Sequence, residues 1–224
     1  MVILKGKIDG DINIGLYAIV NNQIAIVPKI LSFNLDIAEV FKVRVIKASI
    51  YNTPFIGIFA CMNDNGILLS DIISDNEKKA LKKALKEEGV DINVGFLKAR
   101  ENVIGNLILC NNKGALISKT LIKYKKEIAD ILNVDVEIGK IMDLDLVGSL
   151  GVANNKGFLI SAYAEEEEYE KVKEVLGVDG DIGTVNYGSP YVKSGILVND
   201  TSLVVGDITT PIELGRATES LGFL

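Results

Sequence analysis

The sequence contains no histidine among its 224 residues and only two cysteines. Imidazole is the group on which most acid–base catalysis near neutral pH and much zinc binding depend. Its absence excludes cysteine–histidine, serine–histidine and histidine–metal sites in their usual forms, so we expect no catalytic centre, no bound metal and no cofactor. Cys61 and Cys110 stand inside apolar runs, which favours buried, reduced thiols over a nucleophile or half of a metal site.

Long apolar runs are also missing. No stretch approaches the ~18–20 uncharged residues that a membrane span needs. Only three apolar residues lie between Met1 and Lys5, too few for a secretory signal. We therefore expect a cytoplasmic protein without membrane contact. The net charge is −6, whereas proteins that bind naked nucleic acid usually carry a basic surface. A basic partner suits this chain better.

What the sequence does contain is a repeat. A short turn rich in asparagine recurs five times, and its first asparagines are separated by 42, 48, 43 and 45 residues: Asn21, Asn63, Asn111, Asn154 and Asn199. In four copies a glycine stands six residues earlier, and in the fifth a lysine does: Gly15, Gly57, Gly105, Gly148 and Lys193. This spacing predicts five copies of one structural unit in a globular chain.

The pattern within each copy predicts a hairpin, a helix and one further strand. Asparagine and glycine suit the hairpin turn, and the flanking Ile-, Val- and Leu-rich runs are typical of strands buried on both faces. The second helix has a capping box of Ser74 and Glu77 and can end at Gly89, whereas the first is short, around residues 37–41. The closing strands are expected at residues 43–47, 92–96, 134–138 and 182–185.

The fifth unit lacks its closing strand, while a spare strand at residues 1–5 precedes the first unit. We predict that this strand completes the fifth unit and closes the ring, which removes exposed sheet edges. The predicted fold class is α/β (α+β), a closed five-fold pseudosymmetric propeller that forms a single domain over residues 1–224. Its repeats are expected to span residues 6–47, 48–97, 98–139, 140–186, and 187–224 together with 1–5.

Candidates for chemistry are sparse. The pairs Asp143–Asp145 and Asp179–Asp181 could share a proton or a metal, but they lie in turn-like stretches where aspartate is a good turn former. The glycine-rich residues 183–189 lack a phosphate-binding pattern and favour a recognition loop. Lysines line the polar side of two helices and form either an ordinary soluble surface or a local basic patch near nucleic acid: Lys78, Lys79, Lys82, Lys83 and Lys86, then Lys119, Lys123, Lys125 and Lys126.

Along its whole length the sequence resembles the translation initiation factor 6 family, and in its short C-terminus the archaeal form. The matching motifs are Ile-Gly-Asn at 104–106 with Cys-Asn at 110–111, Leu-Val-Gly-Ser at 146–149, Gly-Thr-Val-Asn at 183–186 with Gly-Ser at 188–189, and Val-Asn-Asp at 198–200 with Gly-Asp-Ile-Thr-Thr at 206–210 and Glu-Leu at 213–214. The resemblance implies the pentein ring and no enzymatic activity. It also implies binding to the large ribosomal subunit, on a basic ribosomal protein near the sarcin–ricin loop and with RNA within reach, where the factor blocks joining of the small subunit.

In this family the loops that enter each glycine strand face the ribosome. Carried onto this sequence, the resemblance implies a ribosome-binding set of Asn13, Gly15, Pro54, Gly57, Asn106, Ser149, Tyr191 and Lys193. We expect a monomer. Two other classes stay open: a guanidine-modifying pentein enzyme, which would need the missing histidine, and a clamp-like ring around nucleic acid, which would need lysines lining a wide bore.

Overall fold

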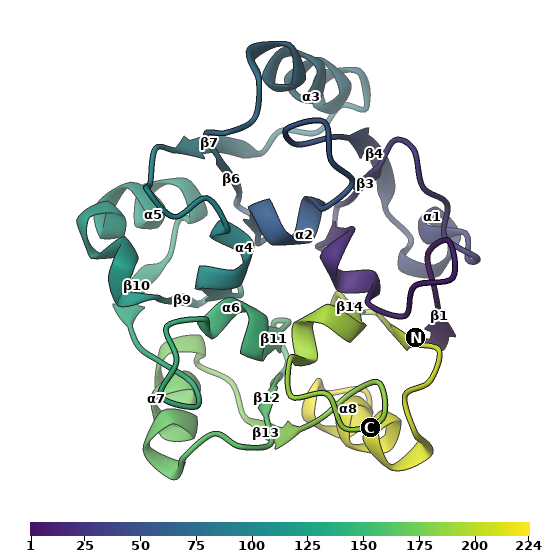
Figure 1. The fold of residues 1–224 in the computed structure, drawn as a ribbon, viewed down its shortest axis with the longest axis vertical. Helices are drawn as coiled ribbons and strands as arrows, with labels where there is room; N and C mark the ends of the chain where they lie inside the picture. Colours follow the sequence, from purple (N-terminus) through teal and green to yellow (C-terminus); the bar gives the residue numbers. More distant parts are fainter.

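The computed structural model describes all 224 residues and shows five small sheets arranged around one axis (Figure 1). Each sheet is an antiparallel hairpin with a third strand parallel to its second strand. The sheets are β2 (Ile19–Val20), β3 (Ile24–Pro28), β4 (Arg44–Ala48); β5 (Ala60–Met62), β6 (Gly66–Ser70), β7 (Asn93–Leu97); β8 (Ile108–Cys110), β9 (Gly114–Ile117), β10 (Asp135–Ile138); β11 (Gly151–Ala153), β12 (Phe158–Ser161), β13 (Gly180–Gly183); and β14 (Ile196–Val198), β15 (Ser202–Gly206), β1 (Val2–Gly6).

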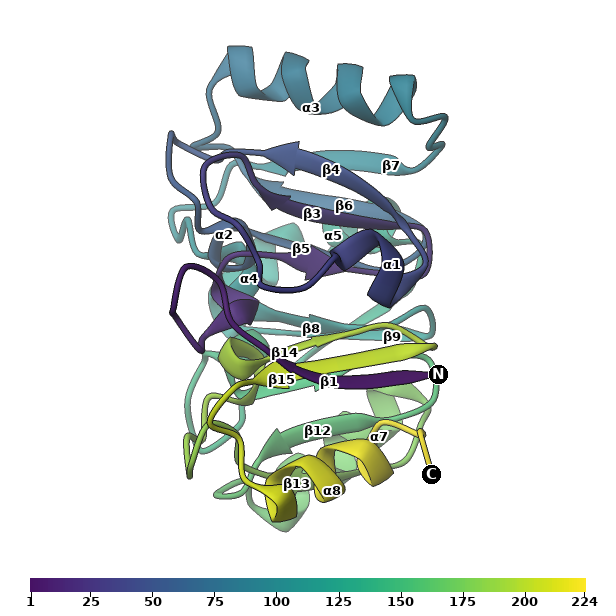
Figure 2. The ribbon, with the colours of Figure 1, turned by 90° about the vertical axis from the view of Figure 1, so that its right-hand side faces the viewer.

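The longer helices form an outer layer around the sheets (Figures 1 and 2). They are α1 (Ile37–Phe41), α3 (Asp75–Glu87), α5 (Lys125–Leu132) after the 3-10 helix η2 (Lys119–Tyr124), α7 (Glu166–Leu176) and α8 (Pro211–Ser220). The predicted capping box of Ser74 and Glu77 is confirmed, and Thr210 with Glu213 forms another. Each helix packs on the sheet of the preceding unit, for example α3 on β4 and α1 on β15. No unit therefore buries its core alone.

The N-terminal strand takes the place predicted for it. β1 runs parallel to β15, with Val2 opposite Ser202 and Gly6 opposite Gly206 (Figure 2). It fills the position that β4 holds in the first unit. β15 is thereby paired on both edges, and the fifth sheet has three strands like the others.

The prediction of a closed propeller is met in part. The structure has five separate three-stranded sheets and no single sheet that closes on itself. Their inner strands lie side by side in a cycle, β2 with β5, β5 with β8, β8 with β11, β11 with β14 and β14 with β2. Side-chain hydrogen bonds also complete a cycle, because the first turn asparagine of each unit donates to the carbonyl of the next at 2.8–3.2 Å: Asn21, Asn63, Asn111, Asn154 and Asn199.

The runs that begin at the repeated glycines differ from their prediction as continuous strands. One helical turn surrounds four of the glycines and Lys193, and the strand starts only after it: η1 (Ile14–Leu16), α2 (Ile56–Phe59), α4 (Ile104–Leu107), α6 (Val147–Leu150) and η3 (Val192–Gly195). The fourth closing strand, predicted at residues 182–185, lies at Gly180–Gly183 because Phe158 pairs with Gly180. Apolar composition alone does not separate a short helical turn from a strand.

Candidate functional site

The five short helical turns meet around the axis at one end of the molecule. A β-carbon on Gly57 would lie 2.0 Å from the carbonyl oxygen of Gly15, and one on Gly105 would lie 2.0 Å from that of Gly57. A contact below about 3 Å cannot be accommodated when the other atom belongs to the backbone. These positions therefore require glycine, because neighbouring turns approach each other too closely for any side chain.

Lys193 occupies the fifth equivalent position, and its side chain reaches the axis. The amine donates hydrogen bonds to the carbonyl oxygens of Gly57 at 2.8 Å and Gly105 at 2.5 Å. Burial lowers the pKa of this amine to about 8 from its ordinary 10.5. The lysine thus joins three of the five turns from within, and its charge is solvated by peptide carbonyls.

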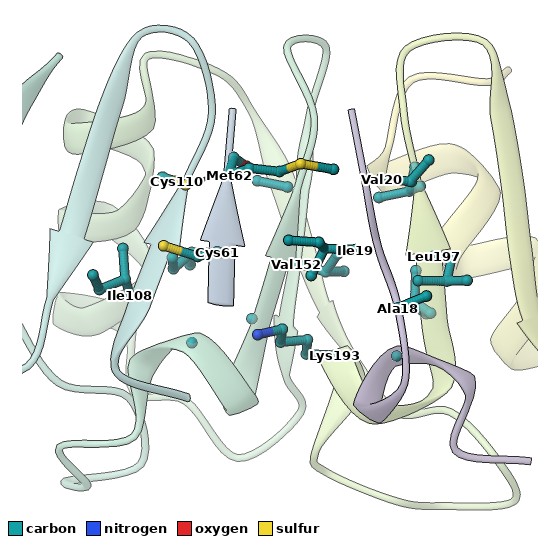
Figure 3. A pocket seen from close by; sticks show the side chains of 17 residues that line it. Ala18, Ile19, Val20, Cys61, Met62, Ile108, Cys110, Val152, Lys193 and Leu197 are labelled. Carbon is teal, nitrogen blue, oxygen red and sulfur yellow. Dashed lines mark hydrogen bonds between the residues drawn. The ribbon is translucent and has the colours of Figure 1, made fainter. Parts of the chain in front are cut away.

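Behind Lys193 lies an axial cavity of about 90 Å³ (Figure 3). Its wall is mostly apolar, formed by the inner strands, and it includes Cys61 and Cys110. A hydrogen bond with Cys110 and, to a smaller extent, burial raise the pKa of the Cys61 thiol. The thiol of Cys110 also donates to the carbonyl of Met62 at 3.6 Å. Both cysteines are free, as predicted. The cavity is far smaller than the roughly 300 Å³ at which ordinary ligand pockets begin.

The opposite end of the axis is filled by a polar ring built from the second residue of each hairpin turn: Asn22, Asp64, Asn112, Asn155 and Asp200. Each accepts a hydrogen bond from the preceding member's backbone at 2.9 Å. The amide of Asn22 also donates to both carboxylates, at 2.7 and 2.8 Å. Because the acids are paired with amide donors, the ring is a satisfied structural network.

The residues predicted to bind a partner converge on the glycine end. A depression of about 360 Å³ opens there, lined by seven of the eight predicted residues: Asn13, Gly15, Gly57, Asn106, Ser149, Tyr191 and Lys193. Gly15 and Gly57 are buried in it, and the amine of Lys193 points to the axis. Pro54 does not line the depression; it lies half-buried in the loop before α2, where its carbonyl accepts from Ile56. Sequence reasoning missed four lining residues: Leu16, Leu146, Ser189 and Ser194.

Several polar groups of this depression are available to a partner. The side chain of Asn106 is half-buried and makes no hydrogen bond within the chain, and Tyr191 is 44% exposed. Asn13, in contrast, is held in place, because its amide and backbone N–H both donate to Asp11. Burial opposes the ionisation of Asp11, but hydrogen bonds from Tyr17 and Asn13 keep its pKa below the usual value. Burial and the bond to Asp11 raise the pKa of Tyr17 to about 12.

Loops on the same side are braced by glutamates at the start of outer helices. Glu213 accepts hydrogen bonds from the backbone N–H groups of Tyr187 and Gly188, which have positive φ angles, and from the hydroxyl of Thr184. Burial works against its ionisation, but these bonds and those from Thr210 lower the pKa of Glu213 to about 2. Equivalent pairs of bonds join Glu77 to Tyr51 and Asn52, and Glu168 to Met142 and Asp143. The loops are therefore preorganised.

The remaining candidates for chemistry are structural. Each acid of the two aspartate pairs forms its own ion pair with a different base: Asp143 with Lys140, Asp145 with Lys119, Asp179 with Lys173 and Asp181 with Arg216. No group of three or more cysteine or acidic side chains is placed to hold a metal ion. None of the helices combines the length and the apolar surface that crossing a membrane requires.

Fold and site together define a class: five α/β units around one axis, with preorganised loops on one face. The sequence pattern of the eIF-6 family matches residues 3–220, so the chain belongs to that family. It is similar to Translation initiation factor 6 of Pyrococcus abyssi, with 42% identity over 84% of this chain and 83% of the relative. The proteins of the same name from Methanocaldococcus jannaschii and Staphylothermus marinus are 36% and 35% identical, each over at least 98% of both chains.

These relatives are named as translation initiation factors, a non-enzymatic class. The prediction that the chain is not an enzyme is therefore confirmed, as is the predicted family. The same finding excludes the guanidine-modifying enzyme that the sequence left open as an alternative.

Proposed function

We propose that this protein acts in translation initiation by binding the large ribosomal subunit through the face that carries the depression. Bound there, it would keep the small subunit from joining prematurely, by occupying the surface that the small subunit needs. The observation that carries the proposal is the family assignment over residues 3–220. Seven of the residues that the family resemblance implies also line one depression, which is consistent with a single binding face.

The proposed scaffold is the closed five-fold propeller of the pentein type, a single domain over residues 1–224 that works as a cytoplasmic monomer. A protein that blocks subunit joining by occupying a surface benefits from a rigid binding face, because ordering a mobile face on binding would cost affinity. The braced turns at Glu77, Glu168 and Glu213 support this part of the proposal.

The proposed anchor is a basic ribosomal protein near the sarcin–ricin loop, with RNA close by. A net charge of −6 favours a basic protein partner. Asn106, Ser149 and Tyr191 offer polar contacts around the depression, and Tyr191 supplies an aromatic anchor of the kind that dominates many interfaces. A specific interface of this sort buries roughly 1,200 Å² or more in total, so the contact would extend from the depression over the braced loops around it.

Co-sedimentation tests the proposal. The protein should pellet with purified large subunits but not with small ones, and it should suppress joining of the two. Asn106→Arg places a long charged side chain in the depression and should weaken binding to large subunits by about tenfold or more, as the loss of an interface centre does. Gln23→Arg is the matched control, because it adds the same charge at the opposite end of the axis. Equal binding to both subunits, or equal losses in both variants, would refute the proposed face.

The clamp-like ring is the weaker candidate. Both ends of the axis are filled, by Lys193 with its carbonyl partners at one end and by the asparagine–aspartate ring at the other. The space between them is about 90 Å³, which leaves no bore for a nucleic acid strand.

A further inference from the structure

Charge is distributed very unevenly along this acidic chain. Residues 78–126 contain 12 of the 24 lysines and arginines but only 4 of the 30 acidic residues, a net charge of +8. The rest of the chain carries the other 12 basic and 26 acidic residues, a net charge of −14. Such asymmetry points to an interaction with a polyanion rather than to general solubility.

The fold gathers this segment on one side of the ring. It builds most of α3, β7, η2 and the start of α5, and between them α4, β8 and β9. Figure 1 shows α3, β7 and α5 in succession along the outer side, whereas α4 lies near the axis. The amines of Lys78 and Lys82 lie over the ring of Phe96 on β7, 5.1 and 5.4 Å from its centre, and α5 packs against β7. Six exposed bases of this segment that form no ion pair are called the basic rim here: Lys79, Lys82, Lys86, Arg100, Lys123 and Lys126.

None of the six bases of the basic rim takes part in an ion pair, whereas Lys83 and Lys119 of the same segment pair with Glu87 and Asp145. Lys82 and Lys86 line a hollow of about 600 Å³ between α3 and β7, and Lys123 and Lys126 line one of about 570 Å³ between α5 and β10. The six charges are therefore unpaired, and four of them flank concave surfaces. Acidic residues also line these hollows: Asp91 in the first, and Asp135 and Glu137 in the second.

Equivalent helices of other units show that the fold does not need these lysines. α7 occupies the same position in the fourth unit as α3 does in the second, yet it carries five glutamates against two lysines. α8 and α1 each carry more acids than bases. Bases outnumber acids on α3, by five to three, and on η2 and α5 taken together, by four to two. The shared scaffold does not require this excess.

We propose that the basic rim binds the phosphate backbone of RNA. Protein interfaces are centred on buried apolar and aromatic anchors, and Ile122 is the single large apolar side chain exposed between residues 78 and 126. Free lysines without such anchors suit phosphates, which they bind as point charges while counterions are released. Arg100 lies in the segment between β7 and α4, four residues before Ile104, so the basic rim reaches the face that carries Asn106. The inference rests on the proposed function in taking that RNA to be ribosomal.

Binding to a labelled RNA hairpin of arbitrary sequence tests the inference without ribosomes. The protein should bind it at about 50 mM KCl, with an affinity that falls steeply as salt rises. Lys79→Glu with Lys126→Glu removes one base from each helix and should weaken binding by about tenfold or more. It should also flatten the plot of log affinity against log salt by about 1.8, which is two phosphate contacts at about 0.9 each.

Lys5→Glu with Lys29→Glu is the matched control. Both lysines are exposed and free of ion pairs, and the change in net charge is the same. No binding by the unaltered protein at low salt, or equal weakening in the two double variants, would overturn the inference. Asn106→Arg separates it from the proposed function, because that variant should lose large subunits while still binding the hairpin. Binding to large subunits without any binding to the hairpin would leave the proposed function standing and refute the basic rim.

Discussion

Replacing Lys193 by methionine removes the axial amine but keeps a chain of similar length. In the folded protein the pKa of Lys193 is about 8, against an ordinary 10.5, because the charged amine is buried. The unfolded chain therefore binds this proton more tightly than the folded chain does. Between about pH 8 and pH 10.5 the folded protein has released the proton while the unfolded chain still holds it, so the free energy of unfolding rises with pH.

The size of that rise follows from the shift. A difference of about 2.5 pKa units, at about 1.36 kcal/mol per unit, corresponds to about 3 kcal/mol. This is an upper limit, since Lys193 is half-buried as a residue and solvent screens part of its surroundings. Lys193→Met should lack the rise altogether. The thiols of Cys61 and Cys110 are the titratable groups that face the amine, and the short helical turns around it contribute none.

Urea denaturation followed by circular dichroism at several pH values between 7 and 10.5 measures the effect. The quantity compared is the difference in free energy of unfolding between the two proteins at each pH. Titratable groups that the substitution does not affect contribute equally to both proteins and cancel. Because the thiol of Cys61 faces the amine and its own pKa is raised in the fold, the comparison is repeated with both proteins carrying Cys61→Ala. If the free energy of unfolding changes with pH in the same way for the lysine and methionine proteins, the amine is not desolvated in the folded state. That result would refute the buried position assigned to the Lys193 amine.

Two further predictions concern the scaffold. Gly57→Ala should lower the free energy of unfolding by about 3 kcal/mol or more, because the new methyl group would lie 2.0 Å from the carbonyl oxygen of Gly15. Gly215→Ala on α8, where nothing lies within 4 Å, should instead be neutral or stabilise by up to about 1 kcal/mol, and thermal denaturation compares the two. Glu213→Gln should remove the part of the stability that the wild-type protein loses as pH falls from 4.5 towards about 2, since the pKa of Glu213 is depressed in the fold. The exposed Glu219→Gln is its control in acid titrations, and identical acid curves for the two variants would contradict the bracing role of Glu213.

Much of the fold could be predicted because it depends on local rules. The capping box at Ser74 and the short helix at residues 37–41 follow from side-chain propensities, and both are present. The pairing of β1 with β15 followed from counting strands in a repeat. The helical turns around the glycines could not be predicted in this way. Residues 56–59 are Ile-Gly-Ile-Phe, a composition typical of a strand, and contact with the neighbouring turn decides their conformation.

The candidate site was predictable in its location but not in its roles. Asn106 and Tyr191 do lie on the depression. That Lys193 points inward depends on how closely five backbones approach the axis, which no pattern in the sequence reports. The turn asparagines act beyond their own turns: Asn63 shapes its turn, but it also donates to Asn111 and to the end of α5. Its recurrence in all five copies, beyond what a turn needs, could have indicated contacts between units.

The differences among the five copies explain how a nearly symmetric ring can bind in one orientation. A surface feature kept in every unit would offer a partner five equivalent ways to dock. Features present once remove that ambiguity, and they lie where the copies diverge: Lys193 in place of glycine, Tyr191 near it, and the lysines of α3 where α7 carries glutamates. An asymmetric partner such as a ribosomal surface can then discriminate one rotation from the other four, because wrong rotations would bring acidic helices to its phosphates. The repeats that deviate most from the shared pattern are therefore the ones expected to contact the partner.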